Sequence, residues 1–95
     1  MSVYVITMVN IHDPEKYKQY AELATIANQK HGGQFLVRGG NPEAIEGSLP
    51  YERVVVNLFE TRQQAKNFYY SVEYQAAKAK REGAADFNMV IVDGV

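Results

Sequence analysis

The chain contains no cysteine among its 95 residues. This excludes disulfides, Fe–S clusters, thiolate zinc sites and a cysteine nucleophile. An excess of one charge is lacking too, because 10 basic residues stand against 11 acidic ones, so we expect no nucleic-acid or anionic-membrane partner. No apolar run approaches the roughly 20 residues of a membrane-spanning helix, and the N-terminus has no leader pattern. We therefore expect a single cytoplasmic domain over residues 1–95.

Two stretches carry the signals that start an α-helix. Asp13 can cap a helix in which Pro14 occupies the first turn, where its missing N–H costs nothing. That helix should end at the glycine pair 32–33. Thr61, followed three residues later by glutamine, forms a capping box that opens the second helix. Ser71 can cap a further helical segment that ends near Gly83.

Four short runs rich in valine, isoleucine and phenylalanine predict β-strands. They cover residues 3–10, 34–38, 53–59 and 87–92. Together with the helical stretches they give the order β-α-β-β-α-β. This is the order of a ferredoxin-like α+β domain, in which two helices cover one face of a four-stranded antiparallel sheet.

Both faces of the predicted sheet are apolar. In the first strand one alternating set is Val3, Val5 and Val9, and the other is Tyr4, Ile6 and Met8. Helices can cover only one face, and the other would exceed the few hundred Å² of apolar patch that monomers tolerate. Burying about 500 Å² of it would supply on the order of 12 kcal/mol before association costs. We therefore expect a homodimer that pairs sheet to sheet, and a charge at Val5 or Val55, on whichever face is open, should prevent it.

Several segments form a pattern that runs through nearly the whole chain. They are Gly32–Gly40, Glu46-Gly47, Arg53–Val56, Glu73-Tyr74-Gln75 and Val92-Asp93-Gly94. On these residues the chain resembles the domain-of-unknown-function 1330 family. The resemblance implies a dimeric α/β barrel, in which two ferredoxin-like protomers face each other sheet to sheet, and it implies no established reaction.

The chain departs from the family pattern at two places. Leu58-Phe59-Glu60 stands where relatives commonly have an acidic residue followed by Phe-Pro, and Val72 replaces the proline of a Ser-Pro-Glu-Tyr segment. The first departure removes a carboxylate that could have served as a base. The second affects how rigidly the helical break at Ser71 is set.

The run Arg38-Gly39-Gly40 directly follows an apolar strand. It places a fixed cation beside a backbone that can turn sharply and approach a ligand closely. Arg38 can therefore bind an anionic or carbonyl-bearing ligand together with these glycines. The alternative is a structural ion pair with Glu46 or Glu52, which would tie the loop of residues 39–50 to the sheet.

Further polar groups are candidates for the same site. Arg53 can bind a ligand or pair with a glutamate such as 46 or 73. Glu46 is a weak candidate for a general base, and its alternative is a solvated carboxylate. Tyr69 and Tyr74 can present phenols to a cleft or pack in the core. His12, after the first strand, is another weak candidate for a base, while Tyr69 is a third.

The sequence shows no metal or cofactor motif. The two histidines are far apart and lack metal-ligand spacing, and neither glycine pair belongs to a phosphate-binding loop. We expect a small organic molecule in a cleft between helices and sheet, with or without cofactor-free monooxygenase or isomerase chemistry, by analogy of fold. The alternative is a non-catalytic structural or stress-related dimer whose arginines form only ion pairs. Arg38 pointing into a hollow would favour small-molecule binding. Full pairing of Arg38 at the surface would favour the structural dimer.

Overall fold

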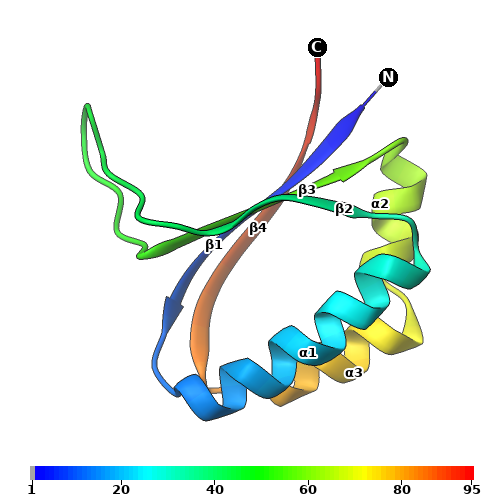
Figure 1. Cartoon of the computed structure of the whole chain (residues 1–95), viewed down its shortest axis with the longest axis horizontal. Helices are drawn as coiled ribbons and strands as arrows, with labels where there is room; N and C mark the ends of the chain where they lie inside the picture. The colour runs from blue at the N-terminus through cyan, green and yellow to red at the C-terminus, as the bar shows by residue number, and fades with distance from the viewer. Residues whose placement is uncertain (1) are drawn as a thin grey trace.

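The protein folds as four strands and three helices, seen in a computed structural model that describes residues 2–95 (Figure 1). The elements are β1 (Val3–Ile11), α1 (Pro14–Lys30), β2 (Gln34–Gly39), β3 (Arg53–Phe59), α2 (Arg62–Tyr69), α3 (Val72–Lys80) and β4 (Ala85–Asp93). The strands form one antiparallel sheet in the order β2-β3-β1-β4. The helices lie on one side of it. The predicted ferredoxin-like fold is confirmed.

Each helix begins at the cap that the sequence predicts. The Asp13 carboxylate accepts hydrogen bonds from two backbone N–H groups of the first turn of α1, and Thr61 and Ser71 each accept one at α2 and α3. The Ser71 hydroxyl also donates to the carbonyl of Phe68 at 2.7 Å. Because this side chain ends one helix and begins the next, the second helical region divides at this point into α2 and α3.

The core lies between the sheet and the helical layer. Its largest fully buried side chains are Tyr74, Phe59, Phe68, Val9 and Asn28. The hydroxyl groups of Tyr20 on α1 and Tyr74 on α3 lie 2.8 Å apart and hydrogen-bond to each other. This contact joins the two helices.

The face of the sheet turned away from the helices is apolar and uncovered. Val37, Val56, Ile6 and Val90 form a row across all four strands on this open face. Val37 and Val90 are 44% and 48% exposed, which is high for valines in the middle of a sheet. Val5 and Val55 face the helices, so a charge that probes the open face belongs at Val56 instead.

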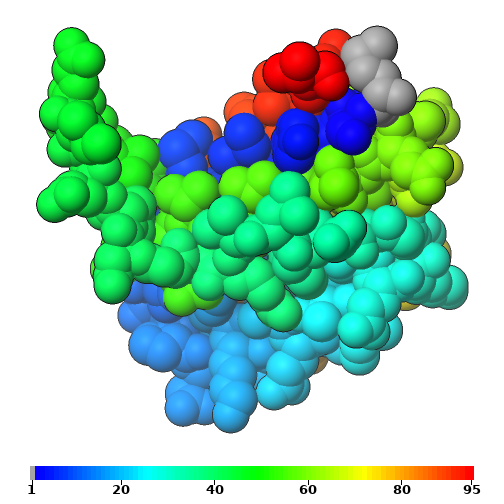
Figure 2. Space-filling view, turned by 45° about the horizontal axis from the view of Figure 1, so that its top comes forward, coloured from blue at the N-terminus to red at the C-terminus, as the bar shows by residue number. Residues whose placement is uncertain are grey.

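Residues 40–52 form an arm that projects beyond the sheet, on the side away from α1 and α3 (Figure 1). The space-filling view shows the arm standing off the remaining surface (Figure 2). Its base is fixed by Asn10, whose amide nitrogen donates to the Pro50 carbonyl at 2.6 Å and whose amide oxygen accepts from the Glu52 N–H at 2.9 Å. Ile45 near the tip is 96% exposed. Among residues 2–95, no helix is long and apolar enough to cross a membrane.

Candidate ligand-binding cleft

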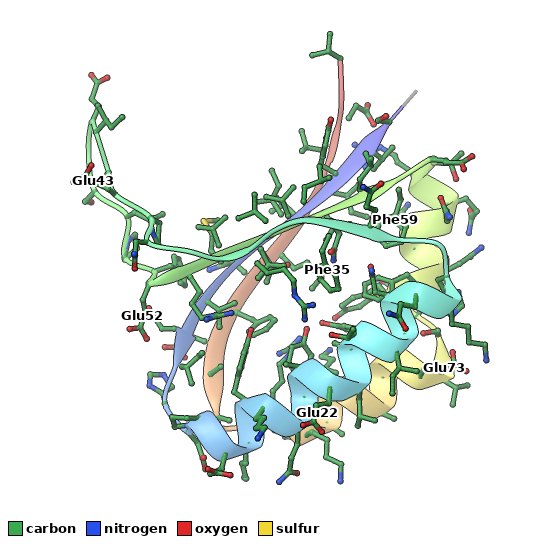
Figure 3. The ribbon with its side chains drawn as sticks, in the orientation of Figure 1. Glu22, Phe35, Glu43, Glu52, Phe59 and Glu73 are labelled. Carbon is green, nitrogen blue, oxygen red and sulfur yellow. The ribbon has the colours of Figure 1, made fainter. Side chains whose placement is uncertain are left out.

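An irregularity in β2 decides which of its side chains face α1. Phe35 pairs with Asn57 on β3, and the next paired residue is Val37, so Leu36 is an additional residue in a β-bulge. In a regular strand Phe35 and Arg38 would point to opposite faces, because side chains alternate. Here both face α1, as Figure 3 shows for Phe35. The guanidinium carbon of Arg38 lies 4.0 Å from the centre of the Phe35 ring.

Four polar side chains surround Val55 on the helix-facing side of the sheet. Thr7 and Arg38 pair with Val55 from the two neighbouring strands. Arg53 and Asn57 lie two positions before and after it on β3. Neighbours across strands are about 5 Å apart and same-face neighbours along a strand about 7 Å apart. These five residues form the floor of a site with an apolar centre and a polar rim.

Helix α1 covers this floor only in part. The hollow between them, here called the α1 cleft, has a volume of about 540 Å³ including its open mouth. Its enclosed part is about 60 Å³. Its lining from α1 consists of Tyr17, Tyr20, Ala21, Ala24 and Thr25. This enclosed part is well below the roughly 300–1,000 Å³ of typical small-molecule pockets, so it limits the ligand to a small one.

The two arginines of the floor are held by contacts other than ion pairs. Arg38 donates from Nη2 to the hydroxyl oxygen of Thr25 at 2.9 Å. The guanidinium of Arg53 lies under Gly39, where a Cβ would come within 2.9 Å of its Nη2 atom. The same guanidinium lies 5.7 Å from the ring centre of Tyr17. The group that approaches Gly39, which has φ of +87°, is thus the side chain of Arg53, whereas the sequence predicted a ligand there.

Within residues 2–95, no carboxylate forms an ion pair with Arg38 or Arg53. Glu52 accepts a hydrogen bond from the backbone of β1, and Glu73 binds side chains at the end of α1. Glu46 is exposed in the arm. The glutamates labelled in Figure 3 all lie outside the space between α1 and the sheet. The structural ion pairs expected as an alternative for these arginines are thus not formed.

Asn57 adds a buried polar group to the cleft. The residue is only 4% exposed, and its Oδ1 atom accepts no hydrogen bond from any described residue. A buried acceptor without a partner is costly, and native proteins rarely keep one without a reason. Asn57 lines the cleft. Asn57 was not among the residues predicted from the sequence, although an asparagine inside the apolar run 54–59 was a visible signal.

The hydroxyl pair of Tyr20 and Tyr74 also lines the α1 cleft. One phenolic proton makes the bond between the two oxygens, which leaves the second available to an acceptor in the cleft. Burial, and then the neighbouring Tyr74, raises the pKa of Tyr20 well above its usual value. Tyr20 therefore stays protonated near neutral pH and can serve as a hydrogen-bond donor.

The other candidates from the sequence lie elsewhere. His12 binds Asp86 at 2.9 Å, with more than half of its side chain exposed. Tyr69 lines a second hollow of about 1040 Å³, including open space, between α2, α3 and β4, together with Lys78. Gly40 has no atom within 4 Å of the position where a Cβ would stand. The cleft thus unites Arg38, Arg53 and Tyr74 and excludes Glu46, His12 and Tyr69. Within residues 2–95 no group of three acidic or histidine side chains is placed to hold a metal.

The strand order and the helices on one side of the sheet place the protein among the ferredoxin-like α+β domains. The sequence matches the family described as "domain of unknown function (DUF1330)" over residues 2–95, and the chain belongs to this family. The resemblance seen in the sequence is thereby confirmed. Comparison with curated protein sequences gives no match.

Solved structures share the fold at low sequence identity. A protein of unknown function from Rhodopseudomonas palustris has a TM-score of 0.80 and 14% identity, over 99% of this chain and 82% of that one. A dimeric ferredoxin-like protein of unknown function from Jannaschia sp. CCS1 has a TM-score of 0.80 and 12% identity, over 99% and 100%. SnoaB from Streptomyces nogalater, a cofactor-independent oxygenase, has a TM-score of 0.67 and 7% identity, over 99% and 93%.

Proposed function

We propose that the protein is a homodimer that binds a small organic molecule in the α1 cleft. The observation that carries the binding proposal is that the two cations of the cleft have no carboxylate partner and its buried amide oxygen has no donor. Arg38 and Arg53 form no ion pair with a described residue, and the Asn57 amide oxygen accepts no hydrogen bond. A structural ion-pair role would give the arginines a carboxylate within the fold. A ligand that supplies the missing partners accounts for all three.

Any reaction in this cleft is limited by what lines it. The lining contains no carboxylate and no imidazole, and the phenol of Tyr20 is held protonated. The lining of the cleft therefore offers no general base of ordinary pKa. A cofactor-free reaction of monooxygenase or isomerase type would have to start from a ligand that already carries negative charge, which the arginines would stabilise.

Binding in the cleft can be tested by filling it. We expect one- and two-ring compounds to shift the backbone amide NMR signals of Ala24, Thr25 and Asn57. The variant Ala21→Leu, which extends a side chain into the cleft, should abolish these shifts while the fold is retained. The same substitution at exposed Ala76 on α3 is the matched control and should leave binding unchanged. Shifts that survive Ala21→Leu, or the absence of any cleft shift across the compounds, would contradict the proposal.

The homodimer is supported by the open face and by the arm. Val37, Val56, Ile6 and Val90 form an apolar row that no described residue covers. The arm, with the exposed Ile45, projects to the same side as this face. Fold relatives from Jannaschia sp. CCS1 and Bacteroides fragilis are described as dimeric. Sheet-to-sheet pairing would remove the row from water and give the arm a surface to pack on.

The assembly can be tested by a charge on the open face. Val56→Asp should shift the sedimentation profile to that of a monomer, because its carboxylate would be buried against a second apolar face. Val72→Asp is the control, since Val72 is 82% exposed at the first turn of α3, where an acidic side chain is favourable. If Val56→Asp sediments as the unaltered protein does, the sheet-to-sheet arrangement is wrong.

A further inference from the structure

The polar groups of the α1 cleft are mainly hydrogen-bond donors. Arg38 and Arg53 offer guanidinium N–H groups, and the tyrosine hydroxyl pair offers one free proton. The Asn57 amide oxygen is the acceptor without a partner. A ligand that matches this set carries acceptors with negative charge at one place and a single donor at another.

The charge of the cleft favours an acid over a neutral compound. Arg38 and Arg53 bring two positive charges, and the lining contributes no negative one. The Nε atom of Arg53 is buried without a hydrogen-bond partner. In a partly enclosed site an unpaired cation is costly, and a carboxylate offsets that cost because its two oxygens match the planar donors of arginine.

The pairing of the strands separates the acid from the donor. Arg53 and Asn57 lie two positions before and after Val55 on β3, and Arg38 is a diagonal neighbour of Asn57 at about 7–8 Å. The side chain of Val55 lies between Arg53 and Asn57, and the ring of Phe35 lies across from Asn57; both are apolar. The part of the ligand between its two polar ends should therefore be apolar and flat, with the size of one ring.

We propose that the α1 cleft takes a one-ring organic acid whose hydroxyl or N–H donor stands at the end opposite its carboxylate. The carboxylate lies at Arg38 and Arg53, the ring covers Val55, and the donor reaches the Oδ1 atom of Asn57. This inference rests on the proposed function, because it names the ligand class of the same cleft. 4-Hydroxybenzoate has these features and serves as the probe.

The test compares three probes by NMR titration of the full chain. Benzoate lacks the donor, and 4-hydroxybenzamide lacks the charge. We expect 4-hydroxybenzoate to bind about tenfold more tightly than either, which corresponds to one well-placed hydrogen bond or one exposed charge contact. Arg38→Gln should weaken both carboxylates about tenfold and leave the amide unchanged. Asn57→Leu should abolish the preference for 4-hydroxybenzoate over benzoate.

Arg62→Gln is the matched control, because Arg62 pairs with Asp93 outside the cleft. It should change none of the three affinities. If 4-hydroxybenzamide binds as tightly as 4-hydroxybenzoate, the ligand is not an acid, although small-molecule binding in the cleft still stands. Equal weakening by Arg62→Gln would show general charge attraction and overturn the inference. So would the absence of cleft shifts with both carboxylates at concentrations on the order of 10 mM, where even weak sites are occupied.

Discussion

Replacing Asn57 with leucine should make the protein more stable. A buried amide without a partner costs about 1–3 kcal/mol, whereas an apolar side chain of similar shape removes that cost. The amide is 4% exposed and lies beside Val55 and Phe35, so leucine would be well buried. We expect Asn57→Leu to raise the free energy of unfolding by about 1–2 kcal/mol. For a domain of this size the Tm should rise by about 4–8 °C per kcal/mol.

Urea denaturation and calorimetry measure this change, at matched protein concentration because association affects the Tm. Asn28→Leu provides the control within the same chain. Asn28 is 2% exposed, its Oδ1 is also without a partner, and its amide nitrogen donates to the carbonyl of Gly33 at 3.0 Å. Losing that hydrogen bond should destabilise the protein by about 1–3 kcal/mol. If Asn57→Leu destabilises by as much as Asn28→Leu, the amide of Asn57 serves the fold and the reasoning about the cleft is wrong.

Three further predictions concern the surroundings of the cleft. Tyr20→Phe and Tyr74→Phe should each lower the free energy of unfolding, measured by urea denaturation, by about 1–3 kcal/mol. The double variant should lose less than the sum, because each single variant leaves the other hydroxyl without its partner. Additive losses would show that the two hydroxyls do not interact. Gly39→Ala should weaken binding of 4-hydroxybenzoate because the new methyl group displaces the Arg53 guanidinium beneath it. Gly40→Ala should bring backbone strain alone, because Gly40 has φ of +75° and open space around its Cβ position. Equal effects of the two variants on binding would refute this. Hydrogen bonds from Lys30 and then from His31, at the end of α1, lower the pKa of Glu73 from 4.5 to about 2. The contribution of Glu73 to stability should therefore be complete above pH 4.5 and lost as the pH falls through 2. The Tm difference between the protein and Glu73→Gln, followed down to pH 2, measures this, and a difference that stays constant over that range contradicts it.

Local signals in the sequence were enough to predict the fold. The caps Asp13, Thr61 and Ser71 place the helix starts because each satisfies backbone N–H groups of its own first turn. The strand of residues 53–59 was predicted with its observed bounds. The two-sided apolar pattern of the first strand also predicted that the helices leave one apolar face of the sheet open, which the structure confirms in the row that contains Ile6 and Val56.

The cleft was only partly predictable, because its make-up depends on strand register. Arg38 and Arg53 were selected for their charge, and the structure brings them together. Their pairing with glutamates was not realised, because the loop that carries Glu46 projects away from the sheet. Asn57 was missed because a polar residue in a strand gains meaning only when its face and its partners are known.

The additional residue in β2 links the cleft to the open face. If Leu36 were to pair with β3 in a regular register, the strand would change phase from that point on, and Val37 would enter the cleft while Arg38 turned to the open face. A second copy covering that face would bury the cation without a partner, so association should disfavour the slipped strand. Assembly of two copies would thereby hold Arg38 in place for the ligand of each.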